Sequence, residues 1–290
     1  MSQRKEINAL IRLLDDEDPE VYENVSKRII SYGTEVIPEL ENAWSDSANL
    51  ALHDRIEELI HIIQFTGLKE DLKDWLNDDL ATLLEGALLV ARYQFPDLNK
   101  DDVYQQIDKA RQKIWLELNQ SYTPLENINI FNQVFYTIIG FNGVKNEEVD
   151  IADFCINHVE ESKKGNAISL GILYIVLSQQ LELPVYGVNL YRHFVLAYQK
   201  NFVFDYDMDN ARETIFYMNP LNKGVPFQRR EIKDYLKSMK MEEKESFFTP
   251  ATNKEIIREL LYYVKFYFVS KDKTIKAEEI SKLIGMFDSH

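Results

Sequence analysis

The sequence predicts a mainly helical α+β protein in which one central, buried helix packs beside a small antiparallel sheet. Apolar residues recur at helical spacing over most of residues 4–119. The segment 166–182 is apolar on nearly every side, and short β-rich runs follow it before helical spacing returns at residue 229. We therefore expect three segments: a helical arm at 1–120, a core at 121–228 and a helical tail at 229–290.

Proline and glycine mark the helix boundaries of the arm. Asp18-Pro19 places a proline in the first turn of a helix that should end near Gly33. The phrase from Asp18 to Leu40 resembles a HEAT-type helical pair, and residues 50–63 are a candidate for the first helix of a second pair. Further helices are expected at about 69–77, 79–94 and 100–119.

The residue pattern changes along the predicted core, residues 121–228. Residues 128–139 are aromatic and β-branched, so helix and strand both remain open there, and 151–161 reads as a short helix. Pro184 should end the central helix. We expect strands at 185–189, 193–198, 202–206 and 214–218. Tail helices are expected at about 229–239, 253–269 and 274–286.

Composition limits the class of protein. Among 290 residues the net charge is -15, which repels phosphate backbones, so nucleic acid is not an expected partner. No run approaches the ~18 apolar residues of a membrane span, and the first residues lack the apolar stretch of a secretory signal. The single cysteine, Cys155, fits a reducing compartment. These features predict an acidic cytoplasmic protein that has no membrane contact.

One constellation in the core carries a family resemblance. Gly165-Asn166-Ala167-Ile168-Ser169-Leu170 opens the central helix, and His193-Phe194-Val195-Leu196 follows on a strand. Together with the turn Asn219-Pro220-Leu221-Asn222-Lys223-Gly224, these motifs resemble the SirB1-type branch of the transglutaminase-like, papain-like superfamily. Phe131-Asn132 also matches the motif that precedes them. The resemblance covers roughly residues 65–227.

The resemblance assigns a role to each position. In this superfamily a cysteine at the start of the helix attacks the substrate, a histidine on a strand activates it, and a third polar residue orients the histidine. Here the cysteine position falls on Ala167, the histidine on His193 and the third residue on Asn219, with Asp205 as a rival. The vestigial site would be lined by Asn166, Ser169, Tyr191 and Arg192.

Because Ala167 has no nucleophile, the resemblance implies a pseudoenzyme, a protein that binds a protein or peptide partner through a degenerate cleft or through its helical arm. The alternative is an unconventional hydrolase or transferase that uses His193 as general base with water or Ser169. Ser169 lies ~200° around the helix from Ala167, which favours a helix-capping role for its hydroxyl. Cys155 is expected to be a small buried residue.

No metal or cofactor is expected. His53 and His61 are eight residues apart, and no pair of cysteines or His-Glu motif accompanies them. The 10 glycines include no phosphate-binding loop. The oligomeric state, the partner and the pathway stay open at this level.

Overall fold

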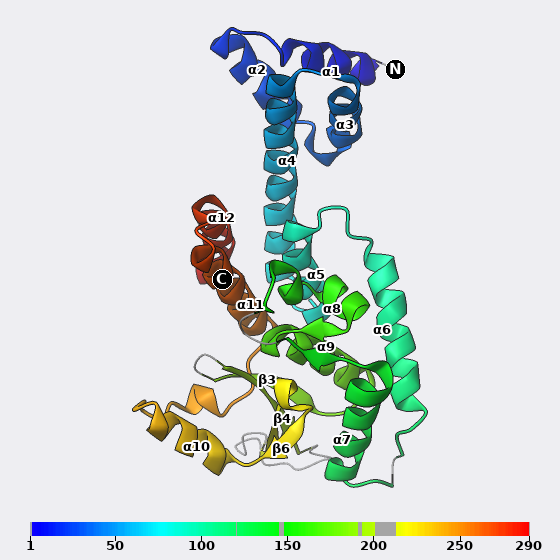
Figure 1. The fold of residues 1–290 in the computed structure, drawn as a ribbon, viewed down its shortest axis with the longest axis vertical. Coiled ribbons are helices and arrows are strands. Elements are labelled where there is room, and N and C mark those ends of the chain that lie inside the picture. Colours follow the sequence, from blue (N-terminus) through cyan, green and yellow to red (C-terminus); the bar gives the residue numbers. More distant parts are fainter. Residues whose placement is uncertain (1, 120, 145–147, 191–192, 201–212, 290) are drawn as a thin grey trace. The chain divides into compact units, whose positions relative to one another are not determined.

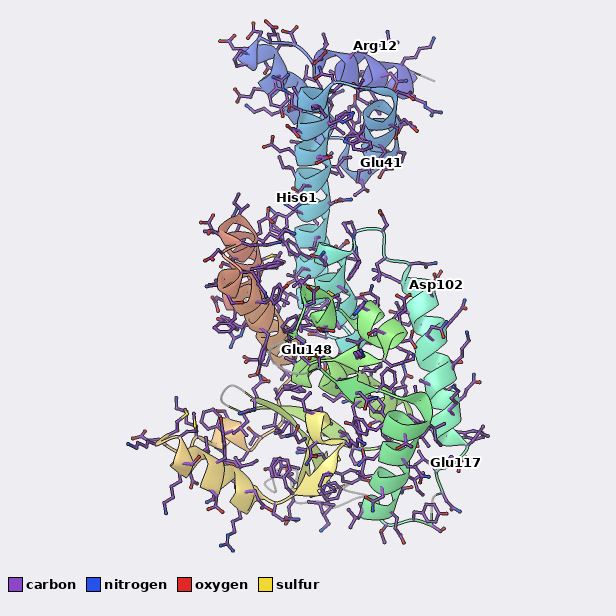
Figure 2. The ribbon with its side chains drawn as sticks, viewed as in Figure 1. Arg12, Glu41, His61, Asp102, Glu117 and Glu148 are labelled. Atoms are coloured by element: carbon purple, nitrogen blue, oxygen red, sulfur yellow. The ribbon has the colours of Figure 1, made fainter. Side chains whose placement is uncertain are left out.

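The computed structural model describes residues 2–119, 121–144, 148–190, 193–200 and 213–289. The chain forms two compact units, Met1–Asp74 and Trp75–His290. In the described part of the chain, no helix is long and apolar enough to cross a lipid bilayer. The excess of negative charge is visible at exposed acidic side chains such as Asp102 and Glu117, at the start of α6 and just after its end (Figure 2).

The first unit is built from helices alone. It contains α1 (Ser2–Leu13), α2 (Pro19–Ile30), the short 3₁₀ turn η1 (Gly33–Val36), α3 (Ile37–Asp46) and most of α4 (Leu50–Asn77). The predicted helix start at Pro19 is confirmed, because the Asp18 carboxylate accepts the Glu20 N–H at 2.9 Å and caps α2. The core of the first unit consists of buried aliphatic side chains, among them Ile11, Ile29, Leu40, Ile56 and Ile63.

The second unit holds the sheet and the remaining helices (Figure 1). The α-helices are α5 (Leu83–Gln94), α6 (Lys100–Trp115), α7 (Pro124–Asn132), α8 (Ile156–Ser162), α9 (Ala167–Gln180), α10 (Arg229–Ser238), α11 (Asn253–Ser270) and α12 (Thr274–Gly285). Shorter helical turns are the 3₁₀ segments η4 (Ile151–Phe154), η5 (Pro220–Asn222), η6 (Glu245–Phe247) and η7 (Met286–Ser289). Residues 128–139, whose sequence is compatible with either a helix or a strand, are helical, because α7 continues into the π-helix η2 (Gln133–Ile139).

Four antiparallel strands form a meander in the order β3 (Val185–Leu190), β4 (His193–Gln199), β5 (Thr214–Asn219) and β6 (Val225–Phe227). A separate parallel pair joins β1 (Asn142–Gly143) to β2 (Lys164–Gly165). Three of the four predicted strands are confirmed, and the one predicted at 202–206 lies outside the described residues.

Each edge of the four-stranded sheet has a local peculiarity. The edge strand β6 contains Pro226, which pairs with Met218 of β5. At the other edge, the Gly187 carbonyl of β3 accepts a hydrogen bond from the Ala251 N–H at 2.8 Å.

The two faces of the sheet pack against different helices. On one face, the Phe194 ring of β4 lies against Gly171 of α9 and Gly187 of β3. On the other face, Val195 and Tyr217 form a buried cluster with Ile232 and Leu236 of α10. Because side chains alternate along a strand, neighbouring residues of β4 belong to different faces.

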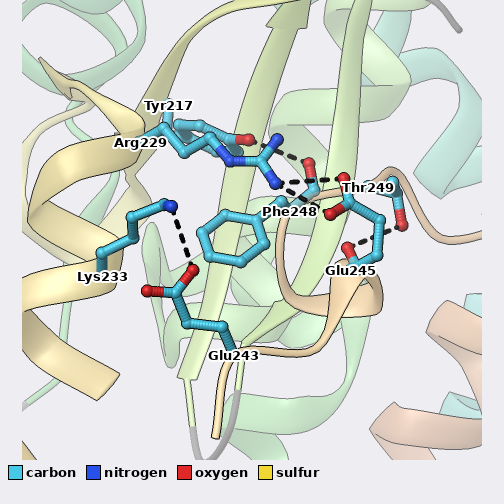
Figure 3. A network of polar contacts seen from close by, with 7 residues as sticks. All are labelled: Tyr217, Arg229, Lys233, Glu243, Glu245, Phe248 and Thr249. Atoms are coloured by element: carbon cyan, nitrogen blue, oxygen red, sulfur yellow. Dashed lines mark hydrogen bonds and ion pairs between the residues drawn. The ribbon is translucent and has the colours of Figure 1, made fainter. Parts of the chain in front are cut away.

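Polar contacts hold α10 and the segment after it together (Figure 3). The Arg229 guanidinium donates to both carboxylate oxygens of Glu245, at 3.1 and 2.9 Å, and stacks 4.0 Å from the centre of the Phe248 ring. The Tyr217 hydroxyl of β5 donates to the Phe248 carbonyl at 2.9 Å. These contacts connect α10 to the segment that contains Glu245 and Phe248, and they connect that segment to strand β5.

Candidate functional site

The candidate site begins at the first turn of α9, where Asn166 caps the helix. The Asn166 backbone is extended, and its side-chain carbonyl accepts the N–H groups of Ile168 and Ser169, both at 3.1 Å. The Asn166 side-chain amide donates in turn to the Asp153 carbonyl at 3.2 Å. Two of the N–H groups that a helix leaves unpaired at its start are thus bonded within the protein.

Ser169 completes this cap from inside. Its side chain is 1% exposed, and the hydroxyl donates to the Asp153 carbonyl at 2.6 Å while accepting the Asn166 N–H at 3.0 Å. Gly165 permits the close approach, because a β-carbon there would lie 2.7 Å from the Ser169 oxygen. The hydroxyl therefore satisfies buried backbone groups, as expected for a capping serine.

Ala167 is the first residue of α9 and is partly exposed. Its methyl group offers neither a nucleophile nor a proton. The structure thus brings together three of the predicted positions, Asn166, Ala167 and Ser169, in one helical turn.

His193 lies on the side of the sheet that α10 covers. Its ring meets the Tyr235 ring of α10 edge to face, with centroids 5.0 Å apart and an interplanar angle of 80°. The His193 side chain is exposed at the start of β4, and the partial desolvation of its ring lowers the pKa of His193, which favours the neutral imidazole. From the other face of β4, the Phe194 side chain contacts α9 at Gly171.

Asn219 ends β5 and caps the turn η5. Its side-chain oxygen accepts the Leu221 N–H at 2.9 Å, and its carbonyl accepts the Gly224 N–H at 3.0 Å. It lies two residues after Tyr217 on β5, so both belong to the α10 face of the sheet. His193 and Asn219 therefore share one face, and α9 packs on the other. Asp205, Tyr191 and Arg192 lie outside the described residues.

A hydrogen-bond network that the sequence does not predict holds the turn at residues 219–224. The Tyr174 hydroxyl of α9 donates to the Asn132 side-chain oxygen at 2.9 Å, and the Asn132 amide donates to the Gly224 carbonyl at 2.9 Å. The Tyr136 hydroxyl donates to the Pro220 carbonyl at 3.0 Å. Asn132 was visible in the sequence as part of the Phe131-Asn132 motif, but no pattern linked it to a turn 92 residues away.

Cys155 is buried as expected. The thiol donates to the Ile151 carbonyl at 3.5 Å, and burial together with Asp150 and Asp153 raises the pKa of Cys155 to about 12. A thiol in this state is almost wholly protonated at neutral pH and is a poor nucleophile. Within the described residues, no three acidic, histidine or cysteine side chains are grouped so that they could hold a metal ion.

Comparison with known proteins agrees with this architecture. Residues 101–262 match the model of the transglutaminase-like superfamily. A UPF0162 protein of Xylella fastidiosa is 26% identical over 160 residues, which cover 55% of this chain and 53% of that protein. A UPF0162 protein of Vibrio cholerae is 24% identical over 150 residues, 52% of each chain.

Human F-box only protein 21 is 23% identical over 166 residues, which cover 49% of this chain and 26% of that protein. The chain thus spans about half the length of the bacterial relatives it matches. No solved structure shows significant similarity to it. Since the matching family model covers more than half of its residues, the chain belongs to the transglutaminase-like superfamily.

Proposed function

We propose that this protein is a non-catalytic member of the SirB1-type branch of the superfamily, which acts by binding a protein or peptide partner. The partner would bind at the surface around the start of α9 or on the helical arm. The observation that carries the proposal is the first turn of α9. Ala167 stands there in place of a nucleophile, and the neighbouring polar groups are bonded to one another.

Cysteine-dependent acyl transfer needs a thiolate, an imidazole within hydrogen-bonding reach and N–H groups that stabilise an oxyanion. Ala167 supplies no thiolate. Of the N–H groups at the start of α9, those of Ile168 and Ser169 are taken by the Asn166 side chain. The imidazole of His193 packs against Tyr235 on the α10 side of the sheet. Each of these features argues against acyl-transfer chemistry at α9.

The alternative, a hydrolase that uses His193 with water or Ser169, has less support. Ser169 is buried and already has a donor and an acceptor, so its attack on a substrate would break the helix cap. His193 would have to activate water on the α10 face, away from the first turn of α9.

Catalysis is tested with the purified full chain on thioester, ester and amide substrates, beside His193→Ala. We expect no turnover above that of the His193→Ala variant. Turnover by the unchanged chain that is lost in His193→Ala would overturn the proposal. Ala167→Cys is a useful companion, because a thiol at a helix start should alkylate faster than Cys155 and yet transfer no acyl group.

Binding is tested by site-specific photo-crosslinking in cells that express the full chain. A crosslinking residue replaces Leu221, exposed in η5 beside α9, or Leu50, which is 76% exposed at the start of α4. Leu80, 86% exposed in the turn before α5, is the control position. We expect a discrete protein adduct from one of the first two positions and none from Leu80. Adducts at neither, or equally at all three, would contradict the proposal.

A further inference from the structure

An apolar stripe runs along the solvent side of α11. It consists of Tyr262, Phe266 and Val269, whose side chains are 44%, 73% and 54% exposed. Their spacing of four and then three residues puts them on one face of the helix, while Ile256 and Leu260 on the opposite face are buried. Fold packing thus accounts for the inner face of α11 and leaves this α11 stripe uncovered.

A further exposed apolar side chain follows the end of α11 in the sequence. Ile275, in the first turn of α12, is 75% exposed. Apolar side chains exposed singly are ordinary, but a row of large ones marks an interaction surface. Phe266 lies in the middle of the α11 stripe, and contact with a partner would bury more apolar surface on its ring than on Tyr262 or Val269.

Lysines are frequent in the sequence from the end of the stripe into α12. Residues 265–276 contain Lys265, Lys271, Lys273 and Lys276, and Asp272 is the one acidic residue among them. The Lys271 and Lys276 ammonium groups lie 5.7 and 5.5 Å from the ring centres of Tyr267 and Phe268, which keeps their charges close to the helix. These four lysines, here called the lysine rim, make residues 265–276 net positive in a chain whose net charge is -15.

We propose that the α11 stripe binds an acidic amphipathic helix of a partner protein. The apolar face of such a helix would pack on Tyr262, Phe266 and Val269, and its carboxylates would meet the lysine rim. Apolar anchors at helical spacing give affinity to helix-on-helix recognition, and complementary charge at the rim sets orientation and partner choice. This surface shares no residue with the first turn of α9, and the inference does not depend on the function proposed above.

Two other occupants fit the observations less well. A membrane with anionic lipids would attract the lysine rim, but its extended negative surface would also face the rest of an acidic chain. A second copy of the protein would bring its own lysine rim and the same net charge. A short acidic segment meets only the local positive patch.

The test uses two fluorescent peptides of about 18 residues, long enough to form a helix once bound. Both carry leucines at helical spacing, and their polar positions are glutamate in one and lysine in the other. Binding to the full chain is followed by fluorescence anisotropy. Phe266→Ser removes the centre of the stripe, and Lys273→Glu reverses a charge of the rim. Leu116→Ser, which changes a side chain 72% exposed just after α6, is the matched control.

We expect the glutamate peptide to bind, and its Kd to rise at least ~10-fold in Phe266→Ser and in Lys273→Glu but not in Leu116→Ser. The lysine peptide, drawn by the overall charge, should be insensitive to Phe266→Ser. Failure of the glutamate peptide to bind, or equal binding to Phe266→Ser, overturns the proposal.

Two further measurements test the other occupants with the same variants. Cosedimentation with phosphatidylcholine–phosphatidylserine vesicles that Phe266→Ser abolishes would assign the stripe to a membrane surface instead. A dimer in analytical ultracentrifugation that Phe266→Ser dissociates would assign it to a second copy. Absence of both supports the acidic helix. Circular dichroism confirms that each variant is folded, as expected for substitutions of exposed side chains.

Discussion

Replacing Gly171 of α9 by alanine tests which side chain of β4 faces this helix. A β-carbon at Gly171 would lie 2.5 and 2.6 Å from two carbons of the Phe194 ring, where ordinary contacts are 3.4–4 Å. The ring has no room to retreat, because a β-carbon at Gly187, on β3, would lie 2.4 Å from its far end. The Phe194 side chain is therefore held between two glycine backbones.

Opposing effects set the size of the change. Alanine is a better helix former than glycine by about 1 kcal/mol, whereas overpacking a core costs about 1–3 kcal/mol. Because the ring is confined from both sides, the cost belongs at the upper end of that range. We expect Gly171→Ala to destabilise the protein by about 2 kcal/mol, which lowers the Tm by roughly 4–8 °C in a domain of this size.

Urea unfolding followed by circular dichroism measures the effect. Gly285→Ala is the control: Gly285 is also helical, but no atom lies within 4 Å of the position that a β-carbon would take there, so that change should be neutral or slightly stabilising. Phe194→Leu combined with Gly171→Ala should show a coupling of about 0.5–3 kcal/mol. If Gly171→Ala costs no more than Gly285→Ala, Phe194 does not face α9, and the placement of His193 on the α10 face then rests on its contact with Tyr235 alone.

Other predictions follow from His193, Ser169 and Cys155. Since burial lowers the pKa of His193, the unfolded chain takes up this proton first as the pH falls through ~6.5. The resulting loss of stability between pH 7 and 5 should be smaller in His193→Gln; parallel Tm–pH curves would contradict this. Ser169→Ala should cost about 1–3 kcal/mol in urea unfolding, because it leaves the Asp153 carbonyl and the Asn166 N–H without this partner; an unchanged midpoint would refute the capping role. Cys155, 2% exposed and with a pKa of about 12, should react with Ellman's reagent at pH 8 only after unfolding, and rapid labelling of the native protein would argue against this burial.

Strong local patterns made most of the fold predictable. The central helix was expected at 166–182 and is α9, because an apolar segment with a capping residue before it and a proline after it has few alternatives. The sequence pattern did not distinguish the π-helix at Gln133–Ile139 from a strand, because its aromatic and β-branched residues are compatible with both. Helices expected separately at 50–63 and 69–77 are one helix, α4, which continues through Gly67.

The candidate site was less predictable than the fold. The family motifs identified the start of α9, the strand with His193 and the turn at Asn219. The period of two along β4 also implied that His193 and Phe194 face opposite ways. Which of them meets α9 depends on the space left by Gly171 and Gly187, which are distant in sequence. The partners of Ser169 and Asn132 are likewise long-range, so local spacing could not identify them.

The edges of the described sheet constrain how this protein can associate with others. A proline in β6 offers no N–H to an incoming strand, and proline on an edge strand is a common barrier to sheet extension. On the opposite side, the Gly187 carbonyl is already occupied by Ala251. An extended peptide thus finds no uninterrupted ladder to join at either edge. Extension of this sheet by a strand of another chain is therefore disfavoured at both of its edges.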